Sequence, residues 1–255
     1  MKKIRISNLS FSYPTEKNGK LPVLNDINLE IKAGDFVVVL GESGCGKTTF
    51  LNLIAGFLKP TGGEVYVDDE RITAPHFSRS FIFQQPLLLP WLNVEDNIAF
   101  GCKLRRDFDH LSGRITNFIK LMGLEGFEQV LPDTLSLGMA QRVAIARSLI
   151  GAPEILLLDE PFTALDFNTR SRLQNELTKL WLKLKFTSVF VTHSIEEALT
   201  VGKKIVILSN RPARVMHTIE LEPEIPRDIN NEIMVSLKVD IQKRFQNINN
   251  REETI

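Results

Sequence analysis

Residues 41–48 have the composition and spacing of a loop that binds phosphate. They read Gly-Glu-Ser-Gly-Cys-Gly-Lys-Thr and fit the pattern G-x-x-x-x-G-K-[S/T]. Glycines let a backbone wrap around an anion and direct several N–H groups toward it. Lys47 can reach the β- and γ-phosphates, and the Thr48 hydroxyl can bind Mg²⁺. The segment therefore predicts a site for ATP and Mg²⁺. The ATP-binding residues expected here are Gly41, Glu42, Ser43, Gly44, Cys45, Gly46, Lys47, Thr48 and Thr49.

Two adjacent carboxylates, Asp159 and Glu160, follow the apolar run 155–158. Ligands of open α/β sheets bind outside the carboxyl ends of the strands. Asp159 is therefore expected to hold Mg²⁺, and Glu160 to orient and polarise an attacking water. Taken alone, the pair could equally be an acidic turn after a strand. Its place downstream of a phosphate loop favours ATP hydrolysis.

The segments around the loop have the patterns of a strand and a helix. The apolar, β-branched run 36–40 predicts a strand buried on both faces, and residues 48–58 predict a helix. Further strands are expected at 80–83, 155–159, 187–192 and 203–208, with helices at 168–185 and 194–201. Strands and helices in alternation predict a mostly parallel sheet. Residues 3–9, 27–31 and 64–72 predict short strands, the last as a hairpin.

Four more motifs accompany the loop and the acidic pair: Phe83-Gln84, residues 135–147, residues 163–166 and Val191-Thr192-His193. Residues 135–147 read Leu-Ser-Leu-Gly-Met-Ala-Gln-Arg-Val-Ala-Ile-Ala-Arg. This resembles the signature region of ATP-binding cassette (ABC) ATPases, usually L-S-G-G-Q-x-Q-R-V-A-I-A-R. The other motifs follow in that family's order and at about its spacing. The resemblance covers residues 3 to about 210.

The resemblance implies roles for individual side chains. Tyr13 matches the aromatic residue that stacks on adenine, with Phe11 as the alternative. Gln84 matches a glutamine that contacts Mg²⁺ and water, with Gln85 as the alternative. His193 matches a histidine near the γ-phosphate, although in isolation it would be a structural histidine at a strand end. The implied catalytic residues are Glu160, His193 and Gln84, and the implied metal ligands are Thr48, Gln84 and Asp159.

The signature region implies a site shared between two copies. Ser136 and Gly138 match groups that reach the γ-phosphate of ATP held by the other subunit, and Asp166 matches an aspartate that contacts across the dimer. The implied assembly is a head-to-tail homodimer, or a dimer with a similar ATPase subunit. Leu137 occupies the position of a common glycine, and Met139 that of a common glutamine. Leucine would be strained only if its position required a positive φ.

The implied fold is α/β: a P-loop NTPase core with a mostly parallel sheet, an N-terminal antiparallel β subdomain and an inserted α-helical subdomain. We expect residues 1–90 and 151–215 to form the core. The helical subdomain is expected at residues 91–150, between these two segments, and contains the signature. Residues 216–255 are expected to form a peripheral tail.

Residues 84–98 resemble the region that, in transporters of this family, borders a groove for a short helix of the membrane subunit. Leu88, Leu89 and Trp91 suit such a contact, or they pack inside the helical subdomain. Segments 84–91, 209–214 and 225–228 resemble the nitrate, sulfonate and taurine importer branch. The resemblance implies membrane permease subunits as partners and, indirectly, a solute-binding protein. The alternative is an exporter-type or a non-transport ABC ATPase.

Charge and hydropathy restrict the partners further. The chain has 31 basic and 31 acidic side chains, and this balance argues against nucleic acid as the main partner. No apolar run approaches the ~18 residues that span a bilayer, and the first residues lack the apolar core of a signal peptide. We expect a cytoplasmic protein, peripheral on the inner face of the membrane through its partners.

Overall fold

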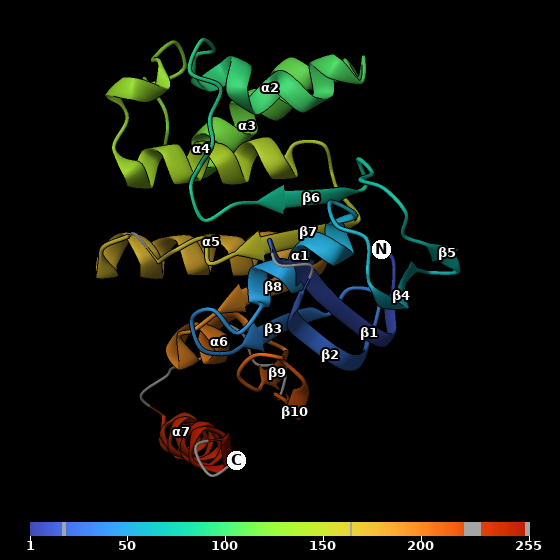
Figure 1. Ribbon diagram of the computed structural model, residues 1–255. Helices are drawn as coiled ribbons and strands as arrows, with labels where there is room; N and C mark the ends of the chain where they lie inside the picture. The colour runs from blue at the N-terminus through green and yellow to red at the C-terminus, as the bar shows by residue number, and fades with distance from the viewer. Residues whose placement is uncertain (17–18, 164, 222–230, 253–255) are drawn as a thin grey trace.

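Two β-sheets form the framework of the computed structural model (Figure 1). The structure describes residues 1–16, 19–163, 165–221 and 231–252, with side chains described as far as residue 245. The larger sheet has six strands in the order β10-β9-β3-β8-β7-β6, and the smaller has four in the order β2-β1-β4-β5. Together with the helices between the strands, this arrangement confirms the predicted α/β fold with an antiparallel N-terminal sheet.

The larger sheet is parallel except at one edge. Its parallel strands are β3 (Phe36–Leu40), β6 (Arg79–Ile82), β7 (Ile155–Asp159), β8 (Thr187–Thr192) and β9 (Lys204–Leu208). Every residue of β3, β7 and β8 is buried. In β3, Phe36 and Val38 pack into one hydrophobic core and Val37 and Val39 into the other. These strands are mostly apolar because both faces of the sheet are covered.

The smaller sheet is antiparallel and consists of β1 (Ile4–Pro14), β2 (Lys20–Ile31), β4 (Gly62–Val67) and β5 (Glu70–Arg71). Strands β1 and β2 are longer than the predicted segments 3–9 and 27–31. Their pairing register shifts at several places, and Asn8 and Asp26 have φ angles of 49° and 54°. Such bulges interrupt the two-residue alternation from which a strand is recognised in a sequence.

Helix α1 (Lys47–Ala55) follows β3 and packs with the smaller sheet. It ends three residues before the predicted end at residue 58. The reason is Gly56, which adopts a left-handed conformation with φ 83° and whose N–H bonds to the carbonyls of Asn52 and Leu53. Glycine is favoured at such a C-terminal cap because it has no β-carbon to strain.

Helices α2 (Val94–Leu104), α3 (Leu111–Leu121) and α4 (Leu137–Leu149) lie together beyond the edge strand β6, at the top of Figure 1, with the short 3₁₀ helix η1 (Pro132–Thr134) between α3 and α4. The predicted helical character of residues 91–150 is confirmed. Side chains of these helices share one hydrophobic cluster with β3, β7 and β8. The division of the chain into domains stays a prediction.

The C-terminal part differs from the prediction. After α5 (Phe167–Leu184) and α6 (Ile195–Val201), an unpredicted strand β10 (Val215–Glu220) pairs antiparallel with β9. Its residues are half-buried or exposed, so it gives a weak hydrophobic signal.

The predicted boundary at residue 216 falls inside β10. The segment predicted as a peripheral tail contributes two side chains to the core, Leu221 and Ile241, the latter in α7 (Glu232–Glu252). Segment 225–228 lies outside the described residues. No helix within the described ranges is long and apolar enough to cross a membrane.

Candidate functional site

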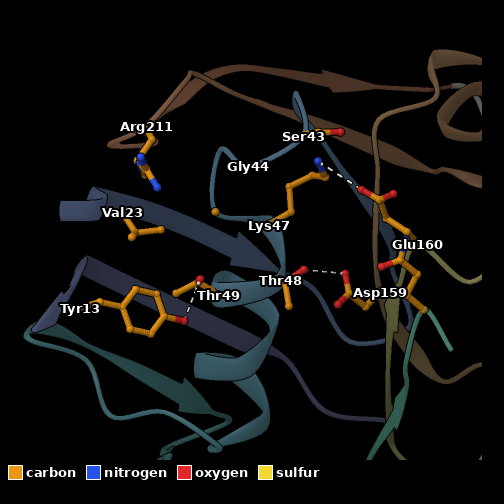
Figure 2. Close-up of a pocket in the computed structure, with 12 residues that line it drawn as sticks. Tyr13, Val23, Ser43, Gly44, Lys47, Thr48, Thr49, Asp159, Glu160 and Arg211 are labelled. Carbon is orange, nitrogen blue, oxygen red and sulfur yellow. Dashed lines mark hydrogen bonds and ion pairs between the residues drawn. The ribbon is translucent and has the colours of Figure 1, made fainter. Parts of the chain in front are cut away.

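The predicted phosphate loop connects β3 to α1 (Figure 2). Two of its glycines, Gly44 and Gly46, have φ angles of 81° and 118°, a region that side chains with a β-carbon rarely adopt. A β-carbon at Gly46 would also lie 2.8 Å from Cγ1 of Val23. After these glycines the chain enters the first turn of α1, where free backbone N–H groups and the helix dipole favour an anion.

Lys47 lies at the centre of this loop and is 4% exposed. Its ammonium donates hydrogen bonds to the carbonyls of Gly41 and Glu42, at 2.9 and 2.8 Å. It also lies 3.3 Å from Oε1 of Glu160, which follows the end of β7 (Figure 2). The loop backbone thus fixes the ammonium, and Glu160 balances its charge.

A cavity of about 400 Å³ adjoins the loop. In Figure 2, Tyr13, Val23 and Arg211 lie on one side of it, and Asp159 and Glu160 lie on the other. Its lining brings together ten of the predicted site residues: Tyr13, Ser43, Gly44, Gly46, Lys47, Thr48, Thr49, Gln84, Asp159 and Glu160. Residues far apart in the sequence therefore converge on one cavity of a size that suits a small ligand.

Tyr13 is the aromatic residue that faces the cavity. It is 37% exposed, and its hydroxyl shares a hydrogen bond with Oγ1 of Thr49 at 3.3 Å. The alternative, Phe11, is 6% exposed and packs edge-on against Tyr13, with ring centroids 4.8 Å apart. The geometry favours Tyr13 for stacking on a base, since Phe11 belongs to the core.

Thr48 and Asp159 provide adjacent oxygen ligands. The Thr48 hydroxyl donates to Oδ1 of Asp159 at 3.0 Å. Burial raises the pKa of Asp159, and the charge of Glu160 adds to this, while the bond from Thr48 and the charge of Lys47 oppose it. No group of three or more His, Cys, Asp or Glu side chains in the described ranges could hold a metal. The pair nevertheless fits Mg²⁺, because Mg²⁺ often takes one or two protein oxygens, with substrate phosphates and water completing its shell.

The raised pKa of Asp159 predicts that this carboxylate destabilises the nucleotide-free protein. Because the folded state favours the protonated form, the stability that this group contributes is full below its ordinary pKa, about 3.9, and is lost as the pH rises through the raised value. We expect Asp159→Asn to raise the thermal midpoint at neutral pH, since the amide is not charged there. The gain should shrink toward acid pH. A lower midpoint for the variant at neutral pH, measured by calorimetry, would contradict this assignment.

Glu160 is held by side chains from three segments. Besides the contact with Lys47, Oε2 of Glu160 is 2.9 Å from Nδ1 of His193 and accepts a hydrogen bond from the Thr163 hydroxyl at 3.2 Å. Its φ is 42°, a conformation that costs a non-glycine residue about 1–3 kcal/mol and that persists where the surroundings impose it. The carboxylate is thus fixed at the cavity wall, where a general base would have to be.

Gln84 and His193 reach the site in different ways. Gln84 follows β6 and lines the cavity, whereas Gln85 is not one of the described residues that line it. His193 follows β8 and joins the site through its contact with Glu160. Cys45 is 2% exposed and packs in the core beneath the loop, and burial raises the pKa of its thiol. Its side chain acts as a small filler.

The predicted signature residues lie at the start of α4, outside this cavity. Ser136 caps the helix, its hydroxyl accepting a hydrogen bond from the Met139 N–H at 3.3 Å. Leu137 is the first helical residue, and its φ is not among the positive ones, so the substitution of a glycine by leucine causes no backbone strain here. Met139 is partly buried against the core.

Asp166 belongs to the same surface as the signature residues. It caps α5 by accepting a hydrogen bond from the Thr169 N–H at 3.0 Å. A β-carbon on Gly138 would lie 3.1 Å from Cγ2 of Thr169, so the starts of α4 and α5 are in contact. None of Ser136, Gly138 and Asp166 is one of the described residues that line the cavity. Their side chains therefore lie apart from the residues that surround Lys47.

Two cavity residues, Val23 and Arg211, were not predicted. Arg211 comes from the loop between β9 and β10, which is attached to β2 by hydrogen bonds from Ala213 N–H to Val23 C=O at 2.8 Å and from Asn25 N–H to Ala213 C=O at 2.9 Å. In the sequence, segment 209–214 stood out only by its resemblance to the nitrate, sulfonate and taurine importer branch. Nothing in that segment indicated that the loop folds back onto the phosphate site.

Comparisons with known proteins show which family the chain resembles. The model of the ABC transporter family matches residues 24–163. The aliphatic sulfonates import ATP-binding protein SsuB of Bacillus cereus is 42% identical over 92% of both chains. The taurine import ATP-binding protein TauB of Roseobacter denitrificans is 40% identical over 83% of this chain and 80% of its own.

A similar fold occurs in a solved structure, the dimer of the ATP-binding cassette MJ0796 in a post-hydrolysis state bound to ADP and Pi. The TM-score is 0.76 at 32% sequence identity, over 87% of this chain and 100% of that one.

Proposed function

Because the chain belongs to the ABC transporter family and is an ATPase of that family, we propose that it is the ATPase subunit of an importer. It couples ATP hydrolysis in a head-to-tail dimer to the uptake of a small solute through a membrane permease. The observation that carries the hydrolytic role is the contact of Glu160 with both Lys47 and His193 at the wall of one cavity. The import role is supported by relatives that are named import ATP-binding proteins.

Each side of the cavity has its own task. Tyr13 stacks on the adenine, and the loop with Lys47 binds the phosphates. Glu160 orients and polarises the attacking water, with His193 fixing the carboxylate. Mg²⁺ that arrives with ATP neutralises the phosphate charge, and Thr48, Gln84 and Asp159 would hold it. Ser136, Gly138 and Asp166 act on the ATP of the second copy.

Exposed apolar side chains near Gln84 suit a permease contact. Trp91 is 72% exposed and Leu87 is 54% exposed, whereas Leu88 packs against the core. The two interpretations of this segment therefore apply to different residues: Leu88 is internal, and Trp91 faces outward to a partner. Such a contact with the permease would hold the chain, as a peripheral protein, on the inner face of the membrane. The proposed solutes are nitrate, sulfonates such as taurine, or a related small organic solute delivered by a binding protein.

The function is tested by affinity purification of the chain from its native membranes, followed by uptake assays in a strain that lacks it. We expect a multi-span permease to co-purify and uptake of at least one of these solutes to fail. Co-purification of ribosomes or DNA, with normal uptake, would exclude the importer role. Trp91→Ala should weaken recovery of the permease. The other tryptophan, Trp181, is buried, so Trp181→Ala is not a suitable control. Phe167→Ala, at an equally exposed aromatic on α5, is the matched control.

Arg211 should strengthen nucleotide binding. Its guanidinium lines the cavity on the same side as Tyr13, and it forms no ion pair with another described residue. An exposed cation beside a polyanion contributes ~0.2–1 kcal/mol, so Arg211→Ala should raise the Kd for ATP about two- to fivefold, less at high salt. Titration calorimetry measures this, with Arg214→Ala, at an exposed arginine of the same loop, as control. Equal affinities for wild type and Arg211→Ala would remove Arg211 from the site.

A further inference from the structure

Two polar side chains of the helical region bond to the loop that follows Gln84. It runs from residue 85 to residue 92, between β6 and α2. At Leu87 its φ is 44°, a left-handed conformation that leucine rarely adopts. Such a conformation persists only where surrounding contacts impose it. The contacts that do so come from Asn97 on α2 and Arg147 on α4.

Asn97 is fully buried beneath the loop, at 0% exposure. Its side-chain oxygen accepts a hydrogen bond from the Leu89 N–H at 2.9 Å. Its side-chain nitrogen donates to the carbonyls of Leu89 and Leu92, at 3.1 and 2.8 Å. A buried amide that directs its donors and acceptor to one loop fixes the backbone of that loop, because each broken bond would leave a buried polar group unpaired.

Arg147 holds the same loop just before Leu89. Its guanidinium donates to the carbonyl oxygens of Pro86 and Leu87, both at 3.0 Å, and reaches the oxygen of Asn97 at 3.5 Å. No carboxylate of the described residues forms an ion pair with it. Burial lowers the pKa of Arg147, but the ordinary value is so high that the group stays charged. A partly buried cation held mainly by loop carbonyls couples the loop firmly to its own helix.

The helix that carries Arg147 also carries the signature residues. Ser136 caps the N-terminus of α4, and Arg147 lies in its last turn, about three turns or ~16 Å further along. A rigid helix therefore connects the group proposed to engage ATP on a second copy with the loop that leads to Gln84.

We propose that Arg147, supported by Asn97, is a positioning residue for Gln84. It ties the Gln84 loop to α4, so that engagement of Ser136 by the second copy's ATP sets the position of Gln84 in its own cavity. The inference rests on the proposed function, which assigns Gln84 to the Mg²⁺ and water site and Ser136 to the opposite ATP.

The same helix provides a matched control. Arg142 also donates to two loop carbonyls, those of Met122 and Gly123, at 2.9 and 3.2 Å. Its Nε lies 3.4 Å from the carbonyl of Gly138, one turn earlier on α4. That loop follows α3 and does not lead to Gln84. Replacing Arg142 removes the same kind of interaction from the same helix, so it reports the cost of losing such an arginine where the attached loop does not lead to Gln84.

Hydrogen exchange of the nucleotide-free chain tests the attachment without requiring activity. Arg147→Ala should accelerate amide exchange in residues 85–92 by about tenfold and leave residues 122–126 unchanged. Arg142→Ala should do the reverse. Arg147→Lys keeps the charge but loses the planar fork, and should give an intermediate increase; it replaces Arg147→Ala if that variant does not fold. Unchanged exchange at residues 85–92 would overturn the attachment, whether or not the chain proves to be an importer subunit.

Phosphate release then tests whether Arg147 acts through Gln84. We expect Arg147→Ala to lower kcat about tenfold with KM for ATP changed less than about twofold, and to slow the Gln84→Ala variant no further. The effects of Arg142→Ala and Gln84→Ala should multiply instead. Multiplying effects of Arg147→Ala and Gln84→Ala would show that Arg147 has only a structural role. A wild type without any phosphate release would refute the proposed function and leave the exchange result to decide the attachment.

Discussion

Glu160→Gln is expected to lower the rate of phosphate release about 10³-fold, within the range for loss of a general base. Glutamine has nearly the same shape, and its amide can still bond to His193 and Thr163, which contact Glu160 now. It cannot accept a proton from water. Binding of ATP should change little, because the phosphate loop and Tyr13 are untouched. Rapid-quench or coupled phosphate assays measure the rate, and equilibrium titration measures the affinity.

The matched control is Glu176→Gln on α5. The side chains of Glu176 and Glu160 are 16% and 14% exposed, and each has a cationic partner, Arg172 or Lys47. Of these two carboxylates, only Glu160 lines the cavity. Glu176→Gln should therefore keep turnover within about twofold. Wild-type phosphate release by Glu160→Gln would remove this residue from the role of general base.

Lys47→Ala is expected to weaken ATP binding about 100-fold. Hydrogen bonds to charged groups contribute ~1.5–3 kcal/mol each, and a loss of about 2.7 kcal/mol corresponds to that factor. The substitution also leaves Glu160 without the cation that lies 3.3 Å away. Two uncompensated carboxylates, Asp159 and Glu160, would then face the incoming phosphates. Titration calorimetry with ATP in the presence of Mg²⁺ measures the change.

Lys203→Ala separates this effect from the general loss of a lysine. Lys203 also pairs with a buried carboxylate, Asp35, at 2.8 Å, but it precedes β9 and does not line the cavity. We expect a lower thermal midpoint and an unchanged Kd for ATP. If Lys47→Ala binds ATP as tightly as Lys203→Ala does, the assignment of the phosphate loop is wrong.

The features that local sequence determines were predictable. The phosphate loop is a contiguous segment, and its glycines and Lys47 specify its conformation without help from distant residues. Buried parallel strands such as β3 and β7 are equally recognisable, because both faces must be apolar. The end of α1 was missed by three residues because a single glycine, Gly56, caps the helix earlier than the apolar pattern suggests.

The features that depend on tertiary contacts were not predictable. The inward face of strand β10 is only half-buried, so its hydrophobic pattern is weak, and the strand is positioned by its antiparallel pairing with β9. Arg211 enters the cavity because backbone bonds join its loop to β2. The resemblance implied one site for Lys47, Glu160 and His193, but the direct contacts of Glu160 with the other two were not predicted, because they depend on how the sheet folds.

We propose that a second copy of the chain completes the site. Light scattering of Glu160→Gln with Mg²⁺ and ATP tests this most directly, because ATP that is bound but not hydrolysed should hold the two copies together. We expect a rise from the mass of one chain, 28.9 kDa, to about twice that value, and no rise when Gly138→Glu is added although ATP still binds. A mass of one chain at saturating ATP, with binding confirmed in the same sample, would contradict it.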